Sequence, residues 1–276
     1  MKQIPFFDYK RLYLDKKTQF LETIDKVASK GGFIMQNELE QFERNISSFC
    51  CSKYALGVGN ATDALELAWH YQGLKKNDEI IISSHTMLAT ASAIKLSGGT
   101  PIPVDIGEDG LIDADEIEKA INKNTVGISP THLNGRTCDM ERIKKIADKN
   151  SLILIEDAAQ ALGSKFKGKH AGTFGSASCI SFYPAKVLGC LGDGGAILIQ
   201  DKSTYENIYK LRDHGRDKEG EVDCWGRNTR LDNIQAALLD LQLQSYSHVI
   251  SRRREIALKY NERLSYLSEL ILPPPP

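Results

Sequence analysis

Short runs of Ile, Leu and Val recur along the first two thirds of the chain, and most are followed by a segment with helical spacing of its apolar residues. Continuous apolar runs of this kind are typical of strands buried on both faces, as in a parallel sheet covered by helices. We therefore predict an α/β fold with a mainly parallel sheet between helices. The predicted strands are 54–59, 79–83, 100–106, 125–133, 151–158, 178–183 and 195–200, and helices are predicted at 86–98, 113–124 and 139–150.

The C-terminal third has a different pattern, because residues 231–267 show long helical periodicity and contain no strand. The chain then ends on "LILPPPP", and four prolines cannot continue a helix. We expect an N-terminal segment at 1–30, a large domain at 31–245, and a connecting helix at 246–276. The last of these would begin a small domain that is incomplete here.

Charge and cysteine usage narrow the functional class. The 35 Lys and Arg residues balance 36 Asp and Glu residues, without long runs of either sign, so we expect neither a nucleic-acid partner nor a membrane surface. The N-terminus lacks the apolar stretch of a signal peptide, and no segment is long and apolar enough to span a membrane. The six cysteines form no CxxC pair, which favours reduced thiols in the cytoplasm, and we expect no metal site.

One lysine stands out in the stretch "SCISFYPAKVLGCLGDGGAILI", between two predicted strands. Lys186 has apolar flanks and is followed by four glycines, which would let backbone pack closely around it. A buried lysine has a lowered pKa and becomes a nucleophilic amine suited to Schiff-base chemistry. The alternative is a surface lysine in a loop. Ser181, five residues earlier, is placed to reach a phosphate.

Two other strands end in polar residues, and in such a sheet ligands bind beyond the carboxyl ends of the strands. Asp157 follows an apolar strand, with Gln160 shortly after it, and can either pair with a ligand cation or cap the next helix. Residues 60–63 begin a helix whose N–H groups and dipole would favour a phosphate, with the hydroxyl of Thr62 nearby. An ordinary N-cap without ligand remains the alternative for this segment.

Together these features fit one cofactor, pyridoxal 5′-phosphate. It needs a lysine for covalent attachment, a carboxylate opposite its ring nitrogen, and a phosphate-binding helix N-terminus. This chain offers all three parts. Along the sequence they are the helix start near 61–62, the carboxylate of Asp157 and the amine of Lys186.

At this point nearly the whole chain resembles the pyridoxal-phosphate-dependent nucleotide-sugar aminotransferases of the DegT/DnrJ/StrS type. These have the aspartate-aminotransferase-like fold with a seven-stranded sheet. "FERNISSFCCSKYALGVGNATDALELA" is similar to their opening block, in which a Gly-Thr pair binds the phosphate; here the pair is Ala61-Thr62. "EDAAQALGSKFKGKHAGTFG" matches their ring-binding block, which assigns Asp157 to the pyridine nitrogen and Gln160 to the side of the ring hydroxyl.

Two further blocks extend the resemblance. "SFYPAKVLGCLGDGGAI" matches the lysine block, which implies that Ser181 binds phosphate and that Lys186 attaches the cofactor. "LRDHGR" with "GRNTRLDNIQAALL" resembles the block in which an asparagine, here Asn228, reaches the phosphate of the neighbouring subunit, so a homodimer is implied. There are two departures. Met87 stands where the family stacks an aromatic ring on the cofactor, and the family runs on for about another hundred residues.

The resemblance implies transamination of a keto-sugar nucleotide, dTDP- or UDP-linked, for amino-sugar and polysaccharide biosynthesis. Glutamate is the expected donor, and "LGCLGDGG" favours amination at the third carbon. Lys186 argues against the family's dehydratase branch, which has histidine there, and the apolar setting of Cys190 argues against a cysteine desulfurase. The remaining alternative is a cofactor-binding or dimerising remnant without catalysis.

Overall fold

The computed structural model describes residues 4–275, so residues 1–3 of the expected N-terminal segment and residue 276 of the expected C-terminal one lie outside it. The helices are α1 (Tyr9–Ala28), α2 (Asn37–Cys50), α3 (Ala61–Tyr71), α4 (Leu88–Leu96), α5 (Ala114–Ala120), α6 (Met140–Lys149), α7 (Lys202–Arg212), α8 (Asn233–Leu243) and α9 (Tyr246–Leu264). The strands are β1 (Tyr54–Val58), β2 (Glu79–Ser83), β3 (Thr100–Val104), β4 (Thr125–Ser129), β5 (Ile153–Asp157), β6 (Lys165–Phe166), β7 (Lys169–His170), β8 (Ala177–Ser181) and β9 (Gly195–Ile199).

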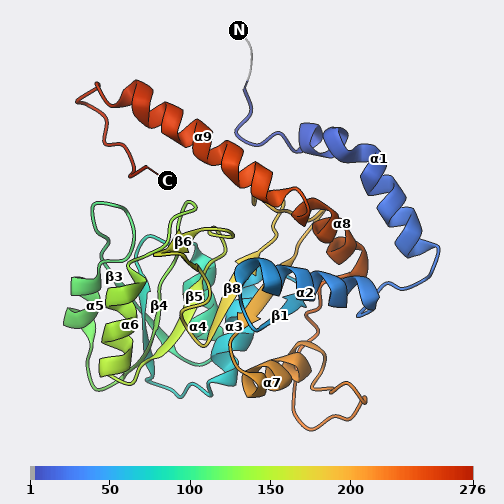
Figure 1. Ribbon diagram of the computed structural model, residues 1–276. Helices are drawn as coiled ribbons and strands as arrows, with labels where there is room; N and C mark the ends of the chain where they lie inside the picture. The colour runs from blue at the N-terminus through green and yellow to red at the C-terminus, as the bar shows by residue number, and fades with distance from the viewer. Residues whose placement is uncertain (1–3, 276) are drawn as a thin grey trace.

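Seven strands form one sheet in the order β1-β9-β8-β5-β4-β2-β3 (Figure 1). The pairs from β8 to β3 are all parallel, whereas β9 is antiparallel to both of its neighbours, β1 and β8. The start of β9 therefore lies at the same edge as the carboxyl ends of β1, β8, β5, β4 and β2. The predicted mainly parallel sheet is confirmed, with β9 as its one reversed strand among the described residues.

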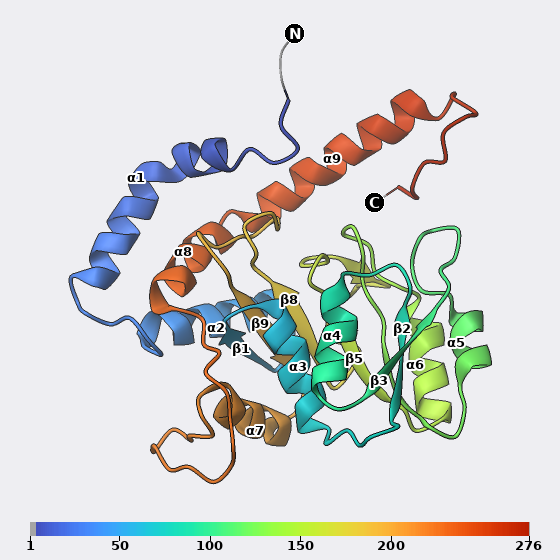
Figure 2. The ribbon, with the colours of Figure 1, turned by 180° about the vertical axis from the view of Figure 1, so that it is seen from behind.

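Helices cover both faces of the sheet, as the two views in Figures 1 and 2 show. On one face α3, α4 and α7 pack on the sheet, with Trp69 of α3 fully buried. On the other face α2 and α8 cover β8 and β9, and α5 and α6 cover the β2–β5 side. Alternate residues of one strand serve the two cores: Ile197 faces α3, and Leu198 faces α2. Side chains that alternate between faces explain why these strands are apolar throughout.

The structure contains α1, α2 and α7, which the pattern did not predict, and it departs from the predicted pattern in two further places. The helical segment 231–267 is two helices, because the chain turns at Gln244 and Ser245 between α8 and α9. The small hairpin β6–β7 was not predicted. Its central residues, Lys167 and Gly168, both have positive φ angles, 49° and 82°. This is the signature of a type I′ turn, which lysine rarely begins, so the sequence gives little signal for it.

Helices α1 and α9 extend from the layered body in both views (Figures 1 and 2). Of α9 only Tyr246 is buried, and its hydroxyl donates to the carbonyl of Leu162 at 3.0 Å. Helix α1 buries Phe20 and Val27 and lies against α8. Among residues 4–275, no helix combines the length and apolar character needed to cross a bilayer. The division into segments 1–30, 31–245 and 246–276 stays a prediction.

Candidate active site

The sheet brings the predicted site residues to one edge. In the register of the strands, Ser181 of β8 and Val58 of β1 both pair with Gly195 at the start of β9. On the next strand, Asp157 ends β5 and lies beside Cys179 of β8. Segments that are far apart in the sequence thus meet where an α/β sheet binds ligands, beyond the carboxyl ends of its parallel strands.

Helix α3 begins directly after β1 at this edge. Asn60 is its N-cap, and the Asn60 side chain accepts the N–H of Asp63 at 2.9 Å. A Cβ atom built on Gly195 would lie 2.7 Å from the nitrogen of Ala61 and 2.5 Å from the carbonyl carbon of Asn60. Glycine is therefore required for β9 to approach the helix start so closely. The N–H groups that open α3 and the hydroxyl of Ser181 consequently border one small region suited to an anion.

Asp157 is buried, with an exposed fraction of 3%, and its carboxylate is held by three donors. The hydroxyl of Thr90 donates to Oδ2 at 2.6 Å, and the N–H of Ala159 and the thiol of Cys179 donate to Oδ1 at 3.1 and 3.3 Å. A buried carboxylate that is hydrogen-bonded in this way is fixed in direction. The alternative role, capping a following helix, is not seen, because residues 158–164 form turns.

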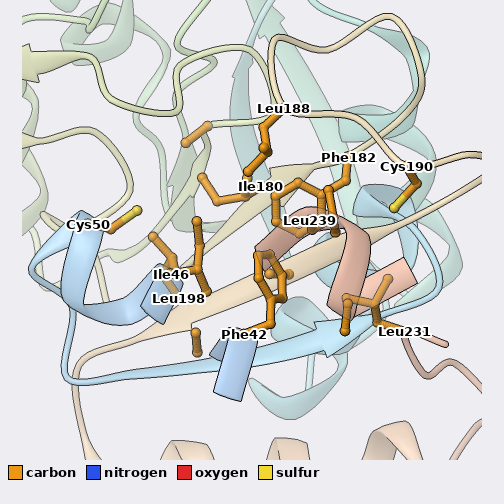
Figure 3. Close-up of a cluster of buried hydrophobic side chains, with 14 of the residues drawn as sticks. Phe42, Ile46, Cys50, Ile180, Phe182, Leu188, Cys190, Leu198, Leu231 and Leu239 are labelled. Atoms are coloured by element: carbon orange, nitrogen blue, oxygen red, sulfur yellow. The ribbon is translucent and has the colours of Figure 1, made fainter. Parts of the chain in front are cut away.

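Lys186 lies at the tip of a short loop between β8 and β9. Both ends of this loop are anchored in the core by buried Phe182 and Cys190, and the N–H of Cys190 donates to the carbonyl of Phe182 at 2.8 Å. Figure 3 shows these two side chains with those of α2 and α8, and Phe182 meets Phe42 edge to face at 5.3 Å. The glycines predicted to allow close packing do so within the loop itself: a Cβ on Gly194 would lie 2.4 Å from Cys190 Sγ.

The Lys186 side chain is half-buried, and burial lowers the pKa of its amine below the ordinary value of 10.5. The nearby charge of Asp157 acts in the opposite direction, which places the two groups within electrostatic reach of each other. A solvated surface lysine would not combine these properties. Lys186 is therefore positioned to be a neutral amine more readily than a free lysine is.

The lowered pKa of Lys186 predicts a pH dependence for covalent capture of an aldehyde. Below its pKa the amine is protonated and is not a nucleophile, so the capture rate should rise with pH. Because the pKa is lowered, the midpoint of the rise should lie below 10.5, the pKa of an unperturbed lysine. Stopped-flow absorbance of cofactor-free protein mixed with pyridoxal phosphate measures this. A midpoint at or above that value, like that of a free lysine, would contradict it.

The remaining predicted residues lie around this centre at different degrees of exposure. Gln160 is half-buried, and its amide oxygen accepts the N–H of Asn134 at 3.1 Å. Met87 immediately precedes α4 and is 67% exposed. Asn228 is exposed, and its backbone forms a bridge with Asp213. The roles assigned to Met87 on the ring face, Gln160 at the ring hydroxyl and Asn228 in a partner's site stay predictions.

The sequence did not single out several residues that shape this edge. Thr229 accepts the N–H of Gly59 at 3.0 Å and donates to Asp63 Oδ2 at 2.6 Å, so it ties the segment after Asn228 to the start of α3. Neither this contact nor that of Thr90 with Asp157 could be predicted, because both join residues distant in sequence through ordinary threonines.

A second carboxylate, Glu156, lies on the opposite side of β5 from Asp157 and is completely buried. It accepts the N–H groups of Gly172, Phe174 and Gly175 at 2.6–2.8 Å, and His132 Nε2 lies 2.8 Å from its Oε2. The N–H of Cys138 donates to Nδ1 of His132, so the ring carries its proton on Nε2 and donates it to Glu156. The sequence does contain a signal for this cluster, because Glu156 lies inside the apolar run "SLILIED". A carboxylate that is buried in such a run requires hydrogen-bond partners.

The thiols near the site are protonated and buried. Burial raises the pKa of Cys190 to about 12, and burial together with Asp157 raises the pKa of Cys179 well above its ordinary value. A thiolate is the reactive form of cysteine. The prediction of an inert Cys190, and with it the argument against a desulfurase, agrees with this setting.

These residues fit pyridoxal phosphate. An amine with a lowered pKa, Lys186, lies within electrostatic reach of a fixed carboxylate, Asp157. The start of α3 lies beside Gly195 of β9, and Gly195 pairs with Ser181 of β8. Because Gly195 has no Cβ, β9 can approach the start of α3 closely. A lysine for attachment, a carboxylate for the ring nitrogen and a helix N-terminus for the phosphate are the three groups that this cofactor requires.

Comparison with known proteins agrees with this geometry. The pattern of the DegT/DnrJ/EryC1/StrS aminotransferase family matches residues 14–276. The dTDP-3-amino-3,6-dideoxy-alpha-D-galactopyranose transaminase of Aneurinibacillus thermoaerophilus is 40% identical over 262 residues, which are 95% of this chain and 72% of that protein.

Solved structures show the same similarity. DesV of S. venezuelae, in complex with a ketimine intermediate, superimposes with a TM-score of 0.92 at 36% identity, over 96% of this chain and 71% of that one. NtdA of Bacillus subtilis, with bound cofactor PMP, gives a TM-score of 0.88 at 32% identity, over 98% of this chain and 62% of that one.

Proposed function

Because this chain belongs to the DegT/DnrJ/EryC1/StrS aminotransferase family, we propose that it transfers an amino group from glutamate to the third carbon of a nucleotide-linked keto-sugar. The cofactor is pyridoxal phosphate. The observation that carries the proposal is the placement of Lys186 and Asp157 at the strand edge that also holds Ser181 and the start of α3.

When bound, the cofactor supplies an electron sink for the carbon that loses or gains a proton. Lys186 would hold it through Nζ, and the free amine would carry the proton between carbon atoms. Asp157 would accept a hydrogen bond from the protonated ring nitrogen, and Gln160 would serve the side of the ring hydroxyl. Ser181, Thr62 and the N–H groups of Ala61 and Thr62 would bind the phosphate. Met87 would pack on the ring.

The substrate proposal rests on the relatives. The transaminase of A. thermoaerophilus acts at the third carbon of a dTDP-linked sugar, as its name states. This is the position that the "LGCLGDGG" segment favours. We propose a dTDP- or UDP-linked keto-deoxyhexose as substrate and an amino sugar for a polysaccharide or another glycan as product. The free thiols of all six cysteines suit a cytoplasmic enzyme, and that location stays a prediction.

Mass spectrometry of purified protein given glutamate and a panel of keto-sugar nucleotides tests the proposal. The panel should contain 3-keto and 4-keto sugars on dTDP and UDP, and a product with one amino group in place of the ketone is expected from a 3-keto sugar. Amination of a 4-keto sugar alone would contradict the position. A bound-cofactor absorption band that does not respond to glutamate would favour the alternative, a cofactor-binding or dimerising protein without transaminase activity.

We propose further that the protein is a homodimer in which Asn228 of one subunit binds the phosphate in the other subunit's site. The exposure of Asn228 next to Thr229, which is tied to α3, supports this. Asn228→Ala should weaken cofactor binding by about 1.5–3 kcal/mol, the typical cost of losing a hydrogen bond to a charged group. Equilibrium dialysis measures the change, and Asn207→Ala, at an exposed asparagine of α7, is the matched control. A monomer in sedimentation that still binds the cofactor tightly would contradict the dimer.

Mixed dimers separate this arrangement from one in which Asn228 serves its own subunit. A dimer of one Lys186→Ala subunit and one Asn228→Ala subunit keeps one intact site if Asn228 acts across the interface. The same dimer keeps none if Asn228 acts within its subunit. Wild-type cofactor affinity at half of the sites is the expected result.

A further inference from the structure

Three threonine hydroxyls form a continuous chain that ends on the carboxylate of Asp157. Thr131 Oγ1 lies 2.8 Å from Thr86 Oγ1, and Thr86 Oγ1 lies 2.8 Å from Thr90 Oγ1. Thr90 Oγ1 in turn donates to Asp157 Oδ2 at 2.6 Å. These hydroxyls come from three segments: Thr86 precedes α4, Thr90 lies in its first turn, and Thr131 follows β4. They meet at the end of β5, where the backbone of Thr131 also forms a bridge with Asp157.

The direction of the chain follows from hydrogen counting. A carboxylate only accepts, so Thr90 uses its one hydroxyl hydrogen on Asp157. Thr86 must therefore donate to Thr90, and Thr131 must donate to Thr86. All three hydrogens point toward Asp157. Hydrogen bonds aligned in one direction polarise each other, and they are stronger where water is excluded.

Most of the hydroxyl chain is shielded from water. Thr90 is fully buried, Thr131 and Asp157 are 5% and 3% exposed, and Thr86 is partly buried. Threonine at position 90 is not required by the helix, because valine has the same shape and a similarly low helix propensity. The hydroxyl, rather than the methyl group, is what the position provides to Asp157.

We propose that Thr131, Thr86 and Thr90 are positioning residues for Asp157. They hold Oδ2 with their aligned hydroxyl chain, so that the carboxylate is fixed in the orientation in which it accepts from the ring nitrogen of the cofactor. This inference rests on the proposed function, in which Asp157 meets that nitrogen. It adds residues whose effect passes entirely through Asp157 and whose own side chains do not touch the cofactor.

The test compares the binding of two ligands to cofactor-free protein by equilibrium dialysis. One is pyridoxal phosphate, and the other is its 1-deaza analogue, which has a C–H group in place of the ring nitrogen. Both can attach to Lys186 and both carry the phosphate, so the ratio of their dissociation constants reports the contact of the ring nitrogen with Asp157. Wild-type protein should prefer pyridoxal phosphate.

Thr90→Val should reduce this preference about tenfold, since it removes the hydroxyl that donates to Oδ2 of the carboxylate. Thr90→Ser, which keeps the hydroxyl, should retain the preference. Thr131→Val, three hydrogen bonds from the carboxylate, should reduce it about threefold. Thr204→Val, at a buried threonine of α7, controls for loss of stability and should leave the ratio unchanged.

The outcomes distinguish failure of this inference from failure of the proposed function on which it rests. If wild-type protein shows no preference, the assignment of Asp157 to the ring nitrogen fails and the inference falls with it. If wild-type protein prefers pyridoxal phosphate but Thr90→Val keeps the full preference, the hydroxyl chain is overturned while the proposed function stands. If Thr90→Val lowers the ratio and Thr131→Val does not, the chain beyond Thr90 is overturned.

Discussion

Lys186→Ala should abolish transamination, with a fall in turnover of about 10⁴-fold, the upper end of what a positioned proton-transfer group contributes. The same change removes the covalent attachment of the cofactor, whereas the phosphate and ring contacts remain. The variant should therefore still bind pyridoxal phosphate, with the absorption spectrum of the unattached aldehyde. Turnover with glutamate and a keto-sugar nucleotide, measured beside this spectrum, tests both statements.

Lys186→Arg is the matched control, because it keeps the positive charge and should keep the fold while it loses attachment. In the wild-type protein, borohydride reduction and peptide mapping should place the pyridoxyl adduct on the peptide that contains Lys186. The lysines of the β6–β7 hairpin, Lys165, Lys167 and Lys169, are exposed and therefore accessible to the aldehyde. An adduct on one of these would overturn the assignment.

Glu156→Gln should lower the free energy of unfolding by about 2–6 kcal/mol, because two of the four donors to this carboxylate lose their acceptor at about 1–3 kcal/mol each. The carboxylate accepts three backbone N–H groups and the His132 ring, and the side chains of Glu156 and His132 are completely buried. A glutamine of the same shape turns an –NH₂ group toward some of these donors, which then have no acceptor. Urea unfolding followed by circular dichroism measures the change.

Glu118→Gln serves as the control, since Glu118 forms an exposed ion pair with Lys149 at 3.6 Å. Exposed pairs contribute little, so a loss within about 0.5 kcal/mol is expected there. A similarly small loss for Glu156→Gln would show that the loop at 172–175 does not depend on the carboxylate. The two glutamates therefore separate the effect of burial from that of the side-chain exchange.

The positions of the strands could be predicted from the sequence, but the direction of β9 could not be read from its composition. An apolar run that is buried on both faces looks the same in either direction. The connection before β9 is the feature that indicates its direction. The segment between 178–183 and 195–200 contains no helix, whereas a parallel neighbour usually needs a crossover connection with a helix, so an antiparallel strand is favoured. Because Lys186 lies in that connection, the reversal of β9 also decides where the lysine is held.

The candidate site could be predicted as far as each residue ends a strand or begins a helix. Asp157, Ser181 and the start of α3 satisfy that rule. Thr90 and Thr229 do not, since their importance comes from which strands and helices are neighbours in space. Gly195 was noted as one glycine among four, and only the structure shows that its missing Cβ lets β9 contact the start of α3.

The pairing of Val58 with Gly195 has a consequence for the order in which the molecule assembles. Strand β1 and the start of α3 leave the ribosome early, but the strand that completes the anion-binding region follows only after β2 to β8 have been made. Thr229, which fastens the same helix start, comes later still. A domain generally folds as a unit, and contacts between segments distant in sequence carry the largest cost of loop closure. Cofactor capture therefore marks the completion of this fold and cannot serve as the template on which folding begins.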